Sequence, residues 1–356
     1  MKFGKKIVFA LLSLTFSMLV CLIMLEVVLR IAVPQHEIPK WLVPSEDYGH
    51  FQRPNFQQVY SYRGTNVTWT ARINNLGLRG DDIDLARRDD RRIVFVGDSF
   101  TFGYGLDEPF IFPTLTGEIL NHTLKEPWTV INTGVGGWGT LQQLKFVSAR
   151  LAEFRPDIIV LTFCDNDLQD DVIFERGKAG GLLPSFPGKQ WLRDHSRLYP
   201  IVYAIMSQRL FSRAISAEDQ QKEIRPQKEL GGPVDQSNPG GPDLIVAWAQ
   251  YWPRTLEAIR SFHNAALSQN PDVIMIVQQA QPLRADIFAM LRTLDNGDSL
   301  RYIHLGLDVE KWEDRNVLLP YDPHWHEVMH QLSARRISEL ILSYLAGRAK
   351  DTPDEQ

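Results

Sequence analysis

The chain has 356 residues but only 2 cysteines, Cys21 and Cys164. Small secreted folds that depend on disulfides carry many more, so the sequence excludes that class of protein. Cys21 lies in an apolar N-terminal segment, and Cys164 follows an apolar run in the middle of the chain, where we expect a buried and unreactive thiol. The fold must therefore depend on a hydrophobic core, and the length allows one large domain or two smaller ones.

An excess of charge of either sign is also missing. The sequence has 38 Lys and Arg residues against 43 Asp and Glu residues, which gives a formal net charge of −5. Proteins that bind nucleic acids carry basic surfaces, and no such basic stretch is visible here. We therefore expect no nucleic-acid partner. No internal repeat is visible either.

Charge is locally absent from Ile7–Leu25, directly after the basic residues Lys2, Lys5 and Lys6. A helix over this segment would be roughly 28 Å long, which is close to the thickness of the hydrocarbon layer of a membrane. Residues 1–33 are therefore predicted to be a short cytoplasmic N-terminus followed by an uncleaved signal anchor.

A cleaved signal peptide is the alternative for this segment. The following Arg30-Ile31-Ala32-Val33-Pro34 lacks the small-x-small pattern of a cleavage site, which favours the anchor. Basic residues before the span and few directly after it place the N-terminus in the cytoplasm. In a bacterial cell the remainder of the chain would then be periplasmic, or lie on the outer face of the inner membrane.

Residues 34–90 are predicted to form a β-rich lead-in that packs on the core. Residues 67–73 alternate between polar and apolar side chains as a half-buried strand does, and Asn74-Asn75-Leu76-Gly77 has the composition of a turn. For Arg79 we expect a structural role in this turn rather than a functional one.

Strands and helices alternate over residues 91–348. Helical patterns lie at 141–154 and 256–267, where Leu256, Ile259 and Phe262 share a face, and a C-terminal helix over about 327–345 is expected to bury Val328, Leu332, Ile337, Ile341 and Tyr344. The expected strands are 93–96, 129–132, 158–162, 273–277 and 302–305. This alternation predicts an α/β fold, a flavodoxin-like three-layer sandwich around a central parallel sheet of about five strands.

The alternation is interrupted at residues 171–247. Gly and Pro residues open and close this stretch, and a short apolar helix is expected at about 198–210. A long insertion that leaves the carboxyl end of a strand usually covers a binding site, so we expect a lid, with 219–243 as its least structured part. Aromatic or apolar side chains in it could stack on a substrate or simply pack: Trp191, Leu198, Tyr199, Tyr203 and Phe211. Residues 349–356 are predicted to be a disordered tail.

The chemical signal is Gly97-Asp98-Ser99 after the apolar run Ile93–Val96, together with Asp322-Pro323-His324-Trp325 far downstream. A parallel strand delivers the residue after it to the edge of the sheet where ligands bind. Serine becomes a nucleophile when a histidine accepts its proton and a carboxylate fixes the histidine tautomer. Ser99, His324 and Asp322 can supply these roles, whereas Asp98 is expected to cap the following helix.

Four blocks in order resemble those of the SGNH (GDSL) hydrolase superfamily, in its membrane-anchored bacterial form. They are Gly97–Thr101, Asn132–Gly139, Asp165-Asn166-Asp167 and Asp322–Trp325. The resemblance implies a serine esterase over roughly residues 90–346. It also places Gly137 and Asn166 at the positions that stabilise the oxyanion, together with the Ser99 N–H. A glycine allows close approach of its N–H, and an asparagine offers a side-chain amide.

A second motif competes with this interpretation. His326-Glu327-Val328-Met329-His330 matches His-Glu-x-x-His, the signature of a zinc protease helix. Only 26 residues follow His330, which leaves little room for a third zinc ligand and the rest of such a fold. We therefore expect no metal and no other cofactor.

The sequence thus predicts an extracytoplasmic serine esterase that hydrolyses O-acetyl or other short acyl esters through an acyl-serine intermediate. Its substrate would be an acylated small molecule or an envelope polysaccharide. Two other functions stay open: a polysaccharide O-acetyltransferase that uses the same triad, and a glycan-binding domain without activity.

Overall fold

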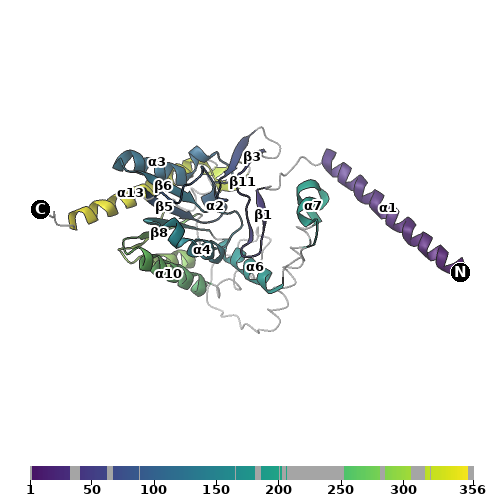
Figure 1. The fold of residues 1–356 in the computed structure, drawn as a ribbon. Coiled ribbons are helices and arrows are strands. Elements are labelled where there is room, and N and C mark those ends of the chain that lie inside the picture. The colour runs from purple at the N-terminus through teal and green to yellow at the C-terminus, as the bar shows by residue number, and fades with distance from the viewer. Residues whose placement is uncertain are drawn as a thin grey trace. The chain divides into compact units, whose positions relative to one another are not determined.

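The computed structural model describes residues 2–32, 41–61, 67–87, 89–164, 166–180, 186–199, 201–202, 206, 252–280, 285–305, 317–320 and 322–351 (Figure 1). The chain divides into two compact units. In the described residues, one unit contains the N-terminal helix α1 and the short helix α7, and the other contains the central sheet with its covering helices.

The first unit is built on α1 (Lys2–Ala32), whose stretch Val8–Ile31 has a mean hydropathy of 2.6. This helix is long and apolar enough to cross a membrane, as predicted, and a signal sequence would meet the same criteria. Within the same unit, the Glu26 carboxylate accepts hydrogen bonds from the N–H groups of Arg197 (2.8 Å) and Leu198 (3.0 Å). The end of α1 is thereby bonded to the turn that follows α7 (Lys189–His195).

The second unit contains a five-stranded sheet in the order β6-β5-β7-β8-β9, and all of its neighbouring strands are parallel. The strands are β5 (Arg91–Val96), β6 (Trp128–Asn132), β7 (Ile158–Phe163), β8 (Ile274–Gln279) and β9 (Leu300–Ile303). Each overlaps one of the five predicted strands. Counted along the chain, the order is 2-1-3-4-5, which is the flavodoxin-like order. The predicted fold class is confirmed.

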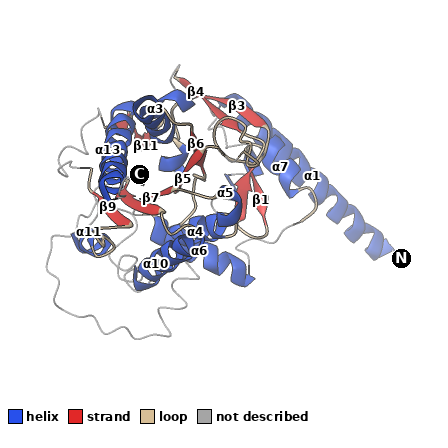
Figure 2. Cartoon of the chain, turned by 60° about the vertical axis from the view of Figure 1, so that its left-hand side comes forward, coloured by secondary structure: helices blue, strands red, loops and turns tan. Residues whose placement is uncertain are grey.

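Helices cover both faces of this sheet (Figure 2). Because side chains alternate along a strand, Val94 and Val96 enter the core under α4 and α10, whereas Ile93 and Phe95 enter the core under α3 and α13. The helices are α3 (Phe112–Leu124), α4 (Thr140–Ser148), α10 (Trp252–Gln269), α11 (Ala285–Arg292) and α13 (Glu327–Asp351). The three-layer arrangement follows from these two separate apolar cores.

Two helix predictions need correction. The single helix expected over 141–154 is two helices, α4 and α5 (Leu151–Phe154), because Arg150 leaves the helical conformation with φ −123° and ψ 7°. In α13, Val328 is 49 % exposed and the prediction that it is buried was wrong. Met329 is buried in its place. The predicted burial of Ile337 and Ile341 is confirmed, and Leu332 and Tyr344 are half-buried.

The lead-in forms two two-stranded sheets, one from β1 (Leu42–Ser45) and β2 (Gly49–Gln52) and one from β3 (Phe56–Ser61) and β4 (Thr68–Ile73). The predicted alternation in β4 is confirmed, since Trp69, Ala71 and Ile73 are buried. Arg79 is also buried, and its guanidinium donates to the carbonyls of Thr70 (3.1 Å) and Leu106 (2.7 Å). These contacts agree with the structural role expected for it.

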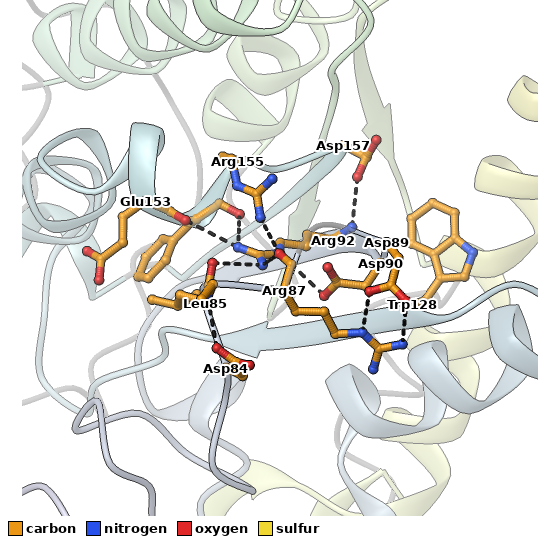
Figure 3. A network of polar contacts seen from close by, with 12 residues as sticks. Asp84, Leu85, Arg87, Asp89, Asp90, Arg92, Trp128, Glu153, Arg155 and Asp157 are labelled. Carbon is orange, nitrogen blue, oxygen red and sulfur yellow. Dashed lines mark hydrogen bonds and ion pairs between the residues drawn. The ribbon is translucent and has the colours of Figure 1, made fainter.

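The amino end of β5 is fixed by the buried side chain of Arg92 (Figure 3). Its guanidinium donates to the carbonyl oxygens of Glu153 (3.2 Å) and Phe154 (3.1 Å) with one terminal nitrogen. The other terminal nitrogen donates to the carbonyls of Leu85 (3.2 Å) and Arg87 (2.7 Å). The remaining N–H points to Asp90 at 3.4 Å. Every N–H of this guanidinium therefore has a partner, as a buried charge requires.

The insertion begins inside helix α6 (Asp167–Gly180), whose residues Leu168, Asp171 and Val172 are buried. Its start at 171 is therefore part of the sheet-bearing unit. Residues 219–243, Tyr203 and Phe211 lie outside the described residues, as does most of the helix expected at 198–210. The disordered tail predicted from 349 was wrong for its first residues, because α13 continues to Asp351.

Candidate active site

Ser99 follows the carboxyl end of β5 and the Gly97-Asp98 turn. It is the first residue of the short helix α2 (Ser99–Phe102). Asp98 caps that helix, since its carboxylate accepts the Phe100 N–H at 2.9 Å. This confirms the capping role predicted for Asp98. Its two neighbours Asp98 and Phe100 are buried, whereas Ser99 is half-buried, so the turn presents the serine hydroxyl at the surface of the sheet edge.

His324 and Asp322 lie on β11 (Asp322–Trp325), which pairs antiparallel with β10 (Leu318–Leu319). His324 Nε2 is 2.7 Å from Ser99 Oγ, although the two residues are 225 positions apart in the chain. His324 Nδ1 is hydrogen-bonded to Asp322 Oδ1, and the same oxygen accepts the His324 backbone N–H at 3.1 Å. The structure thus brings together all three residues predicted as a triad, with both ring nitrogens engaged.

The electrostatics of Asp322 suit this pairing. Burial acts to raise the pKa of its carboxyl, but the hydrogen bond to His324 and the charge of a protonated imidazole lower it, and the pKa lies below its ordinary value. Asp322 is therefore ionised near neutral pH. It can hold the proton on Nδ1 and stabilise the imidazolium.

Aromatic side chains hold His324 in place. Its ring centroid is 4.8 Å from that of Tyr104 and 5.0 Å from that of Phe100. The next residue, Trp325, is fully buried and donates its indole N–H to the Ala280 carbonyl at 2.5 Å. The imidazole therefore has little freedom to turn away from Ser99. Tyr104 was not predicted, because nothing in its local sequence marks it as a neighbour of His324.

The loop after β6 carries Gly136 and Gly137 to the same edge of the sheet. Gly137 has φ +74°, a conformation that favours glycine, and a Cβ on Gly136 would lie 3.6 Å from the Cβ of Ser99. In the part of the chain that the structure describes, no acceptor engages the N–H of Gly137 or of Ser99. Two donors near the nucleophile are thus available to an incoming oxyanion.

Asn166 follows β7 but is already engaged. Its Nδ2 donates to Asp170 Oδ2 at 2.7 Å, and its Oδ1 lies 2.6 Å from Cys164 Sγ. The predicted third donor therefore lies among carboxyl groups behind the nucleophile. An oxyanion would have to compete with Asp170 for its amide hydrogens.

Four buried carboxyl groups lie near Asn166, a feature that the sequence prediction missed. They are Asp98, Asp167, Asp170 and Asp171. Burial raises the pKa of Asp98 and of Asp170 to about 6 and that of Asp171 to about 8, and it raises the pKa of Asp167 well above its ordinary value. Neighbouring carboxylates add to the shifts of Asp167, Asp170 and Asp171. The spacing Asp167-x-x-Asp170-Asp171 on one helix was the available signal, because it places these side chains on adjoining positions of α6.

Asp167 and Asp171 also join the loop after β6, and the start of α4, to α6. Asp167 accepts from Thr140 Oγ1 (2.8 Å) and from Gln143 Nε2 (3.2 Å). Asp171 accepts the backbone N–H of Leu141 at 2.7 Å. The start of α4, directly after Gly139, is therefore held by the helix that follows Asn166.

The His-Glu-x-x-His segment is used differently from a zinc site. His330 is buried, its Nδ1 accepts the Phe112 N–H at 3.1 Å, and burial lowers its pKa to about 3. It thus binds the start of α3 as a neutral imidazole. The described residues contain no group of three or more His, Cys, Asp or Glu side chains that could hold one metal ion. Cys164 is fully buried, as predicted.

The sequence matches one family model, that of the GDSL-like Lipase/Acylhydrolase family, over residues 95–290. This region covers more than half of the chain and includes Ser99, Gly137 and Asn166. No curated protein matches the chain significantly in sequence.

Solved structures are similar at low identity. A family 3 carbohydrate esterase of Clostridium thermocellum is 14 % identical, with a TM-score of 0.39, over 73 % of this chain and 99 % of that one. A psychrotrophic esterase from Pseudoalteromonas sp. is 11 % identical, with a TM-score of 0.40, over 72 % of this chain and 100 % of that one. A GDSL-like lipase from Bacteroides thetaiotaomicron is 10 % identical, with a TM-score of 0.37, over 71 % and 88 %.

Proposed function

The chain belongs to the GDSL-like lipase/acylhydrolase family and is a serine hydrolase that acts on ester bonds, and we propose that Ser99, His324 and Asp322 are its catalytic triad. The observation that carries this proposal is the continuous hydrogen-bonded series from Ser99 Oγ through His324 to Asp322. Chance rarely aligns a hydroxyl, an imidazole and an ionised carboxylate at the ligand-binding edge of a parallel sheet.

In the first half of the reaction, His324 Nε2 accepts the Ser99 Oγ proton while the oxygen attacks the carbonyl carbon of the ester. Asp322 keeps the other ring proton on Nδ1 and faces the positive charge that forms on the imidazole. When the tetrahedral intermediate collapses, the imidazolium gives its proton to the leaving alcohol, and an acyl-serine remains.

The negative charge of the intermediate is stabilised by the N–H groups of Ser99 and Gly137. We include Asn166 as a third donor, which becomes available when its amide turns from Asp170 toward the oxyanion. Each such donor is worth roughly 3–4 kcal/mol of transition-state stabilisation in comparable enzymes. In the second half of the reaction His324 activates a water molecule, which attacks the acyl-serine and releases the acid.

The substrate is proposed to carry O-acetyl or other short acyl esters, on a small molecule or an envelope polysaccharide. Of the two rings beside His324, Phe100 is buried in the core and Tyr104 is half-buried, so Tyr104 is the ring that can limit the size of the acyl group.

We place the catalytic domain outside the cytoplasm, anchored by α1. Lys2, Lys5 and Lys6 precede the apolar helix, and such an excess of basic residues marks the cytoplasmic side. Alkaline phosphatase fused after Gln356 should be active in a bacterial host, and a cytoplasm-dependent reporter fused there should be silent. The reverse pattern would refute this topology.

The activity is tested with the full-length chain in detergent on p-nitrophenyl acetate, with Ser99→Ala as the control. The wild-type chain should hydrolyse the ester and the variant should not, while both unfold at the same temperature. Adding an oligosaccharide acceptor separates hydrolysis from transfer. If acyl transfer rises with acceptor and hydrolysis stays negligible, the chain is an O-acetyltransferase with the same triad.

A further inference from the structure

The lead-in, which lies outside the residues matched by the family model, contacts the proposed oxyanion loop, residues 134–139, through several side chains of β2. His50 is the one that reaches the peptide unit of Gly137. His50 Nε2 lies 2.9 Å from the carbonyl oxygen of Gly136. That carbonyl belongs to the peptide unit that joins Gly136 to Gly137. The N–H of the same peptide unit is the proposed oxyanion donor of Gly137.

The orientation of this peptide unit follows from the contact. The chain has no cis peptide bond in its described residues, and in a trans peptide the C=O and N–H groups point in opposite directions. With its carbonyl directed at His50, the unit directs its N–H away from β2. Gly136, whose Cα approaches the Ser99 side chain, lies at the start of this unit. The contact therefore selects one of the two orientations that a Gly-Gly peptide can adopt.

His50 itself is held firmly. Its backbone N–H donates to the Tyr48 carbonyl at 2.7 Å, and its carbonyl accepts the indole N–H of Trp138 at 3.0 Å. Trp138, directly after Gly137, is fully buried and stacks on Phe51 of β2 at 5.8 Å between ring centroids. The hairpin β1–β2 and the oxyanion loop thus form one packed structure.

We propose that His50 is a positioning residue of the oxyanion hole, which acts by donating a hydrogen bond from Nε2 to the Gly136 carbonyl. This bond fixes the direction of the Gly137 N–H, and it makes that N–H a better donor, because hydrogen bonds through one peptide unit polarise one another. The inference rests on the proposed function, since it gives His50 its role in the same reaction.

A neighbouring residue supplies a matched control. Gln52, two positions along β2, donates to the Gly134 carbonyl at 2.5 Å, in the same loop. The N–H of that peptide unit belongs to Val135 and donates to the Gly97 carbonyl at 3.2 Å, so it is committed to the fold. Loss of the Gln52 bond weakens the loop's attachment without touching the oxyanion donor.

The test compares wild type, Ser99→Ala, His50→Phe, His50→Gln and Gln52→Met as full-length chains. His50→Phe keeps a ring against Trp138 and removes the donor, and His50→Gln restores an N–H donor of similar reach. We expect His50→Phe to lower kcat about tenfold to thirtyfold, less than the loss of a whole oxyanion donor, with KM nearly unchanged. Its affinity for an alkylboronic acid, which forms a tetrahedral adduct on serine, should fall in parallel.

His50→Gln should recover most of kcat, and Gln52→Met should lower the unfolding temperature while it leaves kcat unchanged. An unchanged kcat and boronate affinity in His50→Phe would overturn the inference alone. So would equal losses of kcat in His50→Phe and Gln52→Met, which would show general support of the loop. A wild-type rate no higher than that of Ser99→Ala would instead overturn the proposed function together with the inference.

Discussion

The two ends of strand β5 bury polar groups in opposite ways. At the amino end, every N–H of the Arg92 guanidinium has an acceptor (Figure 3). At the carboxyl end, one oxygen of the buried Asp98 carboxyl group has no hydrogen-bond partner in the part of the chain that the structure describes, and the pKa values of Asp98 and Asp171 are raised. The half-buried Ser99 and the exposed Gly137 present N–H groups there that have no acceptor among the described residues. Satisfied polar burial stabilises a fold, whereas buried carboxyl groups with perturbed pKa values are tolerated where a reaction needs them. The comparison separates a structural end of the strand from a functional one.

The largest effect should come from the functional end, with Asp322→Asn. An asparagine can still reach His324 but stabilises the wrong imidazole tautomer, so kcat should fall by about 10,000-fold. The unfolding temperature should stay near that of the wild type, since the loop geometry is kept. Initial rates on p-nitrophenyl acetate and thermal unfolding of the same preparation check both points. A loss of less than about tenfold would remove Asp322 from the triad.

At the structural end, Arg92→Met should lower the folding stability and leave kcat unchanged. The change leaves Asp90 and four backbone carbonyls without their buried partner, and breaking such a pair costs about 3–5 kcal/mol of folding stability. The kcat of the molecules that remain folded should not change. Denaturant unfolding gives the first quantity, and titration of active sites with a phosphonate gives the second. A fall in kcat per titrated site would show that the two ends are coupled.

Gly137→Ala tests the proposed role of the Gly137 N–H as an oxyanion donor. Gly137 has φ +74°, so an alanine there is strained and turns the N–H from its direction. We expect a loss of about a hundredfold in kcat with little change in KM, as for removal of one oxyanion donor. Steady-state kinetics check the split between the two parameters. A rise in KM with unchanged kcat would instead assign the glycine to substrate binding.

The fold and the arrangement of Ser99, His324 and Asp322 could be predicted from sequence because each leaves a local pattern. Apolar runs such as Ile93–Val96 mark buried parallel strands, and Gly97-Asp98-Ser99 and Asp322-Pro323-His324 lie where such strands or short loops end. The break at Arg150 could not be predicted in this way, because no Gly or Pro in 141–154 marks it. The exposure of Val328 could not be predicted because it and the buried Met329 are adjacent apolar residues.

The contacts of the lead-in were beyond prediction for a different reason. His50 and Tyr104 reach the oxyanion loop and His324 only after the chain has folded, and neither lies in a recognisable motif. The engagement of Asn166 by Asp170 was missed for the same reason, because the motif identifies the amide but not its partner.

The smallest expected effect is on the pH dependence of stability. The raised pKa of Asp171, about 8, means that the folded state holds this proton more tightly than the unfolded chain does. Its contribution to stability is therefore fully present below the unfolded pKa of about 4 and is lost as the pH rises through about 8. Asp98 and Asp170 act in the same direction with pKa values of about 6. Asp322, whose pKa is lowered, contributes stability that is lost instead as the pH falls.

Thermal unfolding from pH 5 to pH 9 measures this effect. The unfolding temperature of the wild type should decline over the range, and Asp171→Asn, which keeps an acceptor for the Leu141 N–H, should flatten the upper part. A decline of equal size in Asp171→Asn would show that another group titrates there. The amino end of β5 offers the control, because Arg92→Met should shift the whole curve downward and leave its shape unchanged.

The most direct measurement is covalent labelling of the full-length chain with a fluorophosphonate, followed by peptide mapping by mass spectrometry. The triad predicts a single adduct on Ser99, absent in Ser99→Ala and formed far more slowly in His324→Ala, although both variants stay folded. An adduct on another residue, or labelling of Ser99 at an unchanged rate in His324→Ala, would contradict the central claim that His324 activates Ser99.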